Sequence, residues 1–277
     1  MAANSMISIQ PTETECVIIR HRGWDAQWQL QFPEMIIAND AVVKYMAPLN
    51  PAWQRDGEQA WSYEWRPDDI YLAAHRPAVP KDQSGQPLYP LRGGLLLRAA
   101  IAVESDQAVA LRLTLSNETD QLLNDVMSDG GCFGARSPSF NAWDVVQRSY
   151  IWTDGRMMSM GALDRTKARL CAYQADPLGY ERPIEKRCED FWGRSTARIG
   201  EPAVLGAVSV DGAHAVAFGY EGSRSALANG KGKACLHSRP EFGAIAPGQS
   251  VTRRGYIFFG ADLQNLASRL RRHLLEK

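Results

Sequence analysis

The chain has 277 residues, and its 31 basic and 31 acidic side chains cancel to a formal net charge of zero. Hydrophobic residues make up 45% and charged residues 22% of the sequence, a composition that excludes an intrinsically disordered chain. The balanced charge offers no general attraction for nucleic acid or for an anionic membrane, so neither is expected as a partner.

Alternation of apolar and polar residues with period two predicts antiparallel β-strands along most of the chain. The first predicted strands are Cys16–Arg20, Trp28–Phe32, Trp61–Trp65 and Ile70–Ala74. The clearest pattern is in Gln107–Ser116, where every second residue is apolar: Val109, Leu111, Leu113 and Leu115. Leu95–Val103 precedes it, and a turn at Glu104-Ser105-Asp106 joins the two strands into a hairpin.

Asp-Gly pairs predict two further hairpins, because both residues tolerate the positive φ of a type I′ turn. Asp154-Gly155 separates Tyr150–Trp152 from Met157–Met158. Asp211-Gly212 separates Ala207–Val210 from Ala215–Phe218. The last predicted strands are Leu170–Tyr173 and Val251–Phe259.

The C-terminus carries the one convincing helix signal. Asp262 is a suitable N-cap, and four leucines recur at helical spacing after it: Leu263, Leu266, Leu270 and Leu274. The sequence therefore predicts an all-β protein, a large antiparallel β-sandwich of the supersandwich kind with a C-terminal helix. We expect a single domain over residues 1–277, and a boundary between two lobes, if there is one, would fall in 76–93.

The N-terminal sequence and the cysteines allow a prediction of the cellular compartment. Met1 to Gln10 lacks a basic region followed by an apolar stretch, so no secretory signal is predicted and a cytoplasmic protein is expected, unless a signal was removed. The apolar runs are too short to span a bilayer. The five cysteines show no CxxC spacing, which favours free, mostly buried thiols; the alternative is a Cys171–Cys188 disulfide.

Two segments predicted to be irregular carry most of the reactive side chains, and long loops of this kind are often functional. In Ser128–Phe140, three glycines accompany Asp129, Cys132 and Arg136, an acid, a nucleophile and a cation. The simpler interpretation is a bulged strand end with Cys132 as a buried small hydrophobic residue. A phosphate-binding loop is excluded because the GxxxxGK[ST] order is missing.

The second segment is Asn229–Phe242. If Ala234–Ser238 is a short strand, Cys235 and His237 share one of its faces. His237 is then a candidate general acid or base, a ligand-binding donor, or a core histidine with satisfied hydrogen bonds. Arg239 and Glu241 follow within a few residues, which favours a functional role.

We expect no cofactor, although one metal alternative stays open. Cys132, Cys235 and His237, with Asp129, are acceptable zinc ligands by donor type, but no spacing rule supports the set. A Cys132–His237 nucleophile pair requires the same contact between the two segments. Of the eight tryptophans, Trp143 and Trp192 fall in predicted loops, where an indole can stack on a sugar or simply cover the core.

One stretch resembles a known family. Gly94–Val126, with its strand, turn, strand and polar turn, is similar to the central hairpins of galactose-mutarotase-like sandwiches and related carbohydrate-active β-domains. The Pro247–Ser250 turn before the last strand is similar to the start of their closing strand. The family uses a histidine acid and a glutamate base, so the resemblance implies His237 as the acid and Glu241 as the base. The family's paired histidine motifs are not found here in their usual order.

These observations predict a carbohydrate- or glycoside-processing protein, as a mutarotase-like epimerase, a lyase or a glycoside-active enzyme, with a small carbohydrate as ligand. Its cleft would lie between loops 129–140 and 229–242, with catalytic residues His237, Asp129 and Glu241. The predicted substrate-binding residues are Arg136, Cys132, Trp143, Trp192, Arg239 and Asn229. The alternative is a non-catalytic sugar-binding or interaction module. The oligomeric state is not predicted.

Overall fold

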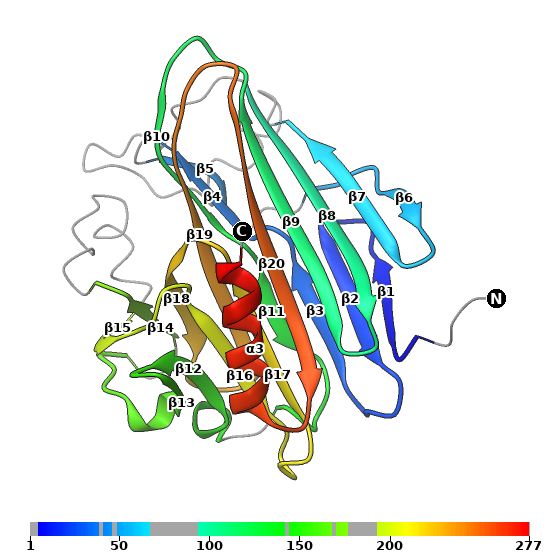
Figure 1. The fold of residues 1–277 in the computed structure, drawn as a ribbon, viewed down its shortest axis with the longest axis vertical. Helices are drawn as coiled ribbons and strands as arrows, with labels where there is room; N and C mark the ends of the chain where they lie inside the picture. The colour runs from blue at the N-terminus through cyan, green and yellow to red at the C-terminus, as the bar shows by residue number, and fades with distance from the viewer. Residues whose placement is uncertain are drawn as a thin grey trace.

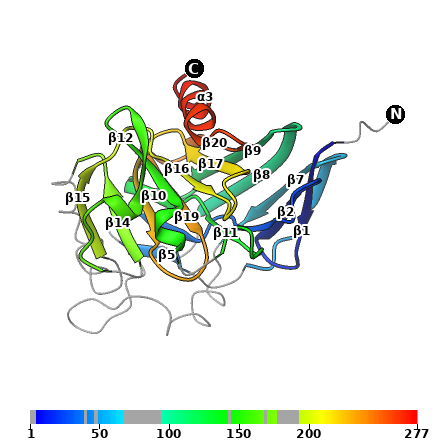
Figure 2. The ribbon, with the colours of Figure 1, turned by 90° about the horizontal axis from the view of Figure 1, so that it is seen from below.

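The computed structural model describes residues 5–38, 41–45, 49–66, 94–141, 144–167, 170–176 and 193–276. Two β-sheets pack face to face, and one helix lies on the outer face of the smaller sheet (Figures 1 and 2). The all-β sandwich with a C-terminal helix is thereby confirmed. Among the described residues, no helix is long and apolar enough to cross a membrane.

The larger sheet has eleven strands in the described part of the chain. Eight follow the order β1 (Ile7–Pro11), β2 (Cys16–His21), β3 (Gln27–Gln31), β11 (Cys132–Ala135), β19 (Cys235–Ile245), β10 (Leu123–Asp129), β4 (Met35–Ala38) and β5 (Ala41–Tyr45). From β19 the sheet also continues through β18 (Ser223–Asn229), β14 (Leu170–Gln174) and β15 (Gly193–Arg198). All the pairs are antiparallel except β14 with β15.

The smaller sheet has nine strands, all paired antiparallel. Their order is β13 (Arg156–Ser159), β12 (Ser149–Thr153), β16 (Val204–Val208), β17 (Ala215–Tyr220), β20 (Ser250–Gly260), β9 (Ala108–Asn117), β8 (Leu95–Ser105), β7 (Ala60–Trp65) and β6 (Gln54–Gly57). The short 3-10 helices η2 (Val145–Gln147) and η3 (Met160–Ala162) flank the β12–β13 hairpin.

Period-two alternation explains how the smaller sheet separates two apolar layers. In β17, Val216 and Phe218 point into the core between the sheets, whereas Ala215 and Ala217 point to the outer face. The helix α3 (Leu263–Leu275) covers that outer face with the four predicted leucines, and the Asp262 side chain caps it by accepting from the backbone N–H of Asn265. Residue spacing alone therefore predicts which apolar residues belong to each of the two layers.

Most of the predicted strands are confirmed within two residues of their ends, including the long β8–β9 hairpin. The type I′ turn is confirmed at Asp154-Gly155, where both φ angles are positive, at 49° and 78°. The second Asp-Gly prediction is wrong in detail, because Val208 pairs with Ala215, which leaves the six residues 209–214 as the connection, and of the Asp-Gly pair only Gly212 has a positive φ. The predicted strand Ile70–Ala74 and the segment 76–93 lie outside the described residues.

The largest errors of the sequence prediction are in the segments taken as irregular. The segment Ser128–Phe140 contains β11, and the segment Asn229–Phe242 runs from the end of β18 into β19; β11 and β18 both pair with β19 in the larger sheet. Pro240 and Gly243 interrupt the β pattern of β19, so its eleven residues read as a loop. The short strand suggested at Ala234–Ser238 is part of β19.

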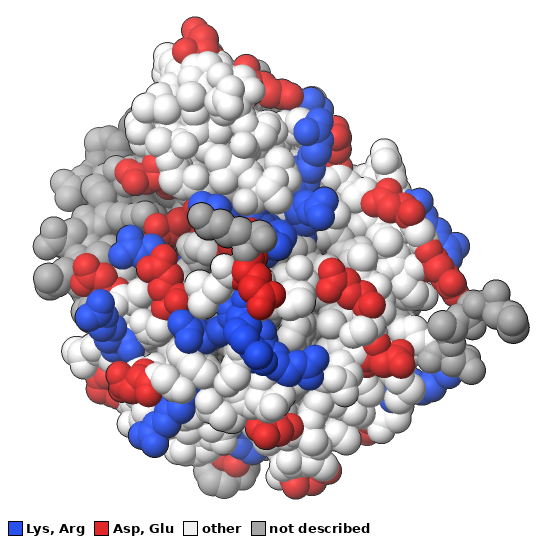
Figure 3. Space-filling model, in the orientation of Figure 1, with Lys and Arg blue, Asp and Glu red and all other residues white. Residues whose placement is uncertain are grey.

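Charge is interspersed over the face shown in Figure 3, where acidic groups lie between the basic ones. The helix α3 contributes Arg269, Arg271 and Arg272. Arg271 sits over the ring of Trp152, 4.9 Å from its centroid, and Arg269 over the ring of Phe258. Arg269 and Arg271 thus help to pack the helix onto its own sheet.

Candidate functional site

The site lies on the face of the larger sheet that points away from the smaller sheet. In the strands β3, β11 and β19, Leu30, Phe133 and Leu236 point into the core. Their neighbours Gln31, Cys132 and His237 pair with one another in register and so point to the opposite face. The strand pairing therefore places residues that lie more than 200 positions apart in the sequence in one row.

His237 is the centre of a buried polar cluster. Its Nδ1–H donates to Oδ2 of Asp129 at 3.1 Å, and Nδ1 lies 2.9 Å from Oε2 of Glu34. On its other edge, Nε2 lies 3.2 Å from Sγ of Cys235. The side chains of His237, Glu34 and Asp129 are 8%, 12% and 4% exposed, so their charges are largely removed from water.

The environment of His237 changes its proton affinity. Burial alone lowers the pKa of the imidazole, but the negative charges of Asp129 and Glu34, together with the hydrogen bond to Asp129, outweigh it and raise the pKa from 6.5 to about 10. An imidazolium is thus favoured at neutral pH, and both ring nitrogens carry a proton.

Glu34 is the functional candidate that the sequence prediction missed. Its Oε2 is buried and, although it lies close to Nδ1 of His237, no hydrogen-bond donor among the described residues is aligned with it. Glu34 stands in the short connection between β3 and β4, directly after Pro33. Glu34 belongs to no apolar pattern, so the only sequence signal for a functional role is its position in a turn beside a predicted strand.

Two glycines explain how Asp129 reaches the cluster. Asp129 ends β10, and the chain passes through Gly130 and Gly131 into β11, so that both strands pair with β19. A Cβ at Gly130 would lie 2.6 Å from the ring of Tyr220, and one at Gly131 would lie 2.6 Å from Leu30. Glycine is therefore required at Gly130 by the close approach of the smaller sheet, and at Gly131 by the close approach of the neighbouring strand β3.

Cys132 and Cys235 form a disulfide across β11 and β19. The prediction of free thiols is wrong for this pair, and a Cys132 nucleophile activated by His237 is excluded in this form because its sulfur is bonded. Cys16 and Cys171 are free and buried, as expected, and burial raises the pKa of Cys171 to about 11. Cys188, the partner in the alternative disulfide, lies outside the described residues.

The other predicted site residues are spread along the same sheet. Arg239 is fully buried two residues after His237, on the same face of β19. Glu241 is two residues further on, so Glu34, and not Glu241, is the glutamate that contacts His237. Asn229 ends β18, half-buried. Trp143 and Trp192 lie outside the described residues.

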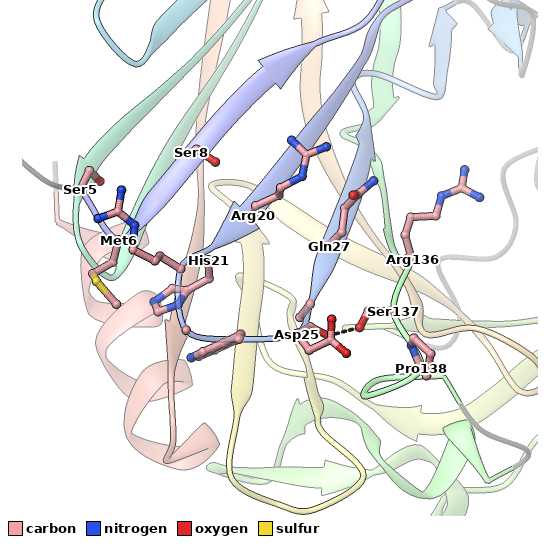
Figure 4. A pocket seen from close by; sticks show the side chains of 14 residues that line it. Ser5, Met6, Ser8, Arg20, His21, Asp25, Gln27, Arg136, Ser137 and Pro138 are labelled. Atoms are coloured by element: carbon pink, nitrogen blue, oxygen red, sulfur yellow. Dashed lines mark hydrogen bonds between the residues drawn. The ribbon is translucent and has the colours of Figure 1, made fainter.

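Arg136 lies at the end of a separate pocket, shown in Figure 4. The pocket has a volume of about 560 Å³, and Arg20, Gln27 and Arg136 line it from neighbouring strands. The Arg136 guanidinium donates to the side chain of Gln29. Arg136 directly follows β11 and comes four residues after Cys132, which corresponds to about 13 Å of extended chain. The pocket and the His237 cluster therefore follow one another along the same face.

Two overlapping sets of side chains are arranged as metal ligands in the described part of the chain. Glu34, Asp129 and His237 form one, and Cys132, Cys235 and His237 form the other. In each set the donor atoms lie within 4.8 Å of one another. The first set combines two carboxylates with one imidazole, so it suits hard cations less well than a site made only of oxygen ligands would. The second set, two sulfurs and one imidazole, has donors that are typical of zinc sites.

The raised pKa of His237 predicts that stability falls as the pH rises. Between its ordinary pKa of 6.5 and about 10, the folded protein keeps a proton that the unfolded chain has lost, so the free energy of unfolding decreases by up to about 1.4 kcal/mol per pH unit. Among the described residues, Asp129 and Glu34 are the charged groups in contact with the imidazole, and Nζ of Lys44 donates to the backbone carbonyl of Glu34.

Urea unfolding of the oxidised protein from about pH 6.5 to about pH 8.5 measures this slope, below the range in which Cys171 contributes. The His237→Gln variant is expected to lose most of the slope. Equal slopes in the two proteins would contradict the assignment of the proton to His237.

No protein-family model matches the sequence, and no curated protein matches it. Solved structures do match its fold. The Slr1438 protein from Synechocystis is 9% identical, with 94% of this chain and 97% of that chain covered and a TM-score of 0.47. A GalM/aldose epimerase homologue from C. elegans is 7% identical over 92% and 98% of the chains, with a TM-score of 0.44.

An α-galactosidase from Geobacillus stearothermophilus is matched over 98% of this chain but 32% of that chain, at 10% identity and a TM-score of 0.36. These are weak likenesses of the fold, with identities of 7–10% and TM-scores of 0.36–0.47.

Proposed function

We propose that the protein processes a carbohydrate by acid–base chemistry, as a mutarotase-like sugar epimerase, at the cluster of His237, Glu34 and Asp129. The observation that carries the proposal is the buried carboxylate oxygen of Glu34, which has no aligned donor and lies 2.9 Å from a protonated imidazole. A proton acceptor next to a proton donor, both shielded from water, is the arrangement that general acid–base catalysis requires.

Each residue has a distinct role in this proposal. Glu34 takes the proton of the anomeric hydroxyl, and His237 gives a proton to the ring oxygen as the bond from that oxygen to the anomeric carbon breaks. The proton leaves from Nε2, whose hydrogen-bond contact among the described residues is a sulfur, a weak acceptor, whereas Nδ1 is held by Asp129. After rotation of the aldehyde, the ring closes by the reverse transfers, and the other anomer forms without net gain or loss of protons.

The pocket around Arg136 supplies binding in the same proposal. Its arginines and Gln27 offer donors to sugar hydroxyl or acidic groups, and Arg239 and Asn229 remain binding candidates closer to His237. Trp143 and Trp192 remain predictions from the sequence.

Replacing Arg136 by alanine is expected to raise KM about tenfold, while kcat stays within about twofold, because the residue lies some 13 Å along the chain from Cys132, the residue paired with His237. Initial rates over a range of sugar concentrations separate the two constants. Arg156→Ala, an exposed arginine on the far hairpin of the smaller sheet, is the matched control. A fall in kcat alone would contradict a binding role.

The experiment that tests the function is anomer exchange, followed by NMR. Glucose, galactose, their uronic acids and their 6-phosphates are each mixed with the full chain, and the α-to-β exchange rate is compared with that of the sugar alone. We expect a faster exchange with at least one of them, and a loss of the acceleration in His237→Gln.

Binding without acceleration, seen as saturable line broadening, would overturn the enzymatic proposal in favour of a non-catalytic sugar-binding module. If none of these sugars shows either binding or faster anomer exchange with the protein, the proposal that they are its ligands is overturned.

A further inference from the structure

The Cys132–Cys235 disulfide lies beside the Nε2 edge of His237, on which no carboxylate of the described residues makes a contact. Nε2 of His237 lies 3.2 Å from Sγ of Cys235, and Cys132 is bonded to that sulfur and pairs with His237 in register. Two sulfurs and one imidazole nitrogen therefore converge on a single point between β11 and β19. Thiolate and imidazole are the donors that zinc prefers in proteins.

The surroundings of His237 match those of a metal-bound histidine. Such a histidine commonly donates its second ring N–H to a carboxylate, which fixes the ring and makes the binding nitrogen more basic. Here Nδ1–H donates to Asp129 at 3.1 Å, and Asp129 is in turn held at the Gly130-Gly131 turn, where its Oδ1 accepts from the N–H of Gly131. The ring is thus oriented with Nε2 towards the sulfurs.

We propose that reduction of the Cys132–Cys235 disulfide creates a zinc site made of Cys132, Cys235 and His237. A dithiol reductant supplies two electrons and two protons: the sulfur–sulfur bond breaks, two thiols form, and the reductant becomes a disulfide. Zn²⁺ then displaces the two thiol protons and the proton on Nε2 of His237, all three of which pass to solvent, and binds both sulfurs and Nε2. Its fourth position is open to water, as in zinc sites that bind a substrate.

The geometry allows this change with little movement. Cys132 is half-buried, so a thiol can reach its sulfur, whereas Cys235 is almost fully buried. Two sulfurs bound tetrahedrally at about 2.3 Å from zinc lie roughly 3.8 Å apart. Side-chain rotation can provide this separation between residues whose Cα atoms are 6.1 Å apart. The strands need not move.

Metal titration of the full chain tests the proposal without any sugar, so its outcome is independent of the proposed function. The protein is prepared oxidised and reduced, dialysed against Zn²⁺ or Co²⁺, and assayed for bound metal by elemental analysis. Cobalt also reports thiolate ligands through its charge-transfer absorption. The variants are Cys132→Ser, which removes a ligand, and Cys171→Ser, which removes a buried free thiol as the matched control.

We expect one metal ion per reduced chain, none in the oxidised chain, and a thiolate–cobalt absorption that Cys132→Ser loses and Cys171→Ser keeps. Asp129→Asn is expected to weaken zinc binding roughly 10- to 100-fold. Equal metal content in the oxidised and reduced wild type would overturn the proposal, and this comparison decides even if Cys132→Ser does not fold. Metal binding that survives in Cys132→Ser would also overturn it.

Discussion

Replacing Glu34 by glutamine is expected to lower kcat for sugar anomer exchange by about 10²- to 10⁴-fold, the range that one general base contributes. Glutamine has almost the same shape but cannot take a proton at neutral pH. The substitution removes the one buried carboxylate oxygen in the cluster without an aligned donor, while Asp129 still orients His237. KM is expected to change little, because the loss affects the reaction step rather than binding.

The control for this variant is Glu64→Gln. Glu64 lies on β7 in the smaller sheet, is about half exposed, and pairs with Arg98. The Glu64→Gln substitution should leave kcat unchanged. If Glu34→Gln retains full activity while Glu241→Gln loses it, the base is Glu241, as the family resemblance implied, and the role given to Glu34 is wrong.

Replacing Lys44 by methionine is expected to destabilise the protein by about 3–5 kcal/mol, the cost of leaving a buried charge without its partner. Nζ of Lys44 lies 3.1 Å from Oε1 of Glu15, and both side chains are fully buried. Glu15 also accepts from Gln31 and from the backbone N–H of Leu49, so it cannot turn towards water. Urea denaturation measures the change.

The double variant Glu15→Gln, Lys44→Met is expected to recover much of this loss, because neither charge then remains in the protein interior. Arg98→Met is the matched control: it breaks an ion pair with about half of each side chain exposed, and should cost less than about 1 kcal/mol. A cost for Lys44→Met as small as that of Arg98→Met would show that the buried pair is not a major source of stability.

The candidate site shows how far residue types can lead before the fold is known. Asp129 and His237 were singled out from two separate segments, and they are in hydrogen-bond contact although they lie 108 positions apart. Neither segment is a loop, however. Their chemistry is placed by strand register: the pairing of β11 and β10 with β19 brings Asp129, Cys132 and His237 to one point.

Glu34 and the disulfide illustrate contacts that no local pattern can predict. Glu34 is a single charged residue after a proline, and such residues are usually exposed. Cys132 and Cys235 are 103 residues apart, with other cysteines available, and cysteine connectivity cannot be deduced from spacing. The contact of Glu34 with His237 and the pairing of Cys132 with Cys235 both depend on which strands become neighbours in the sheet.

The sequence by itself determined the strand alternation of β8, β9 and β20, the Asp154-Gly155 turn and the apolar stripe of α3, because each depends on residues a few positions apart. Only the tertiary structure decided which strands pair with β19, which cysteines bond, and which glutamate faces His237. Those outcomes arise from long-range packing and from burial of charge, whose energies belong to neighbours in space rather than in sequence.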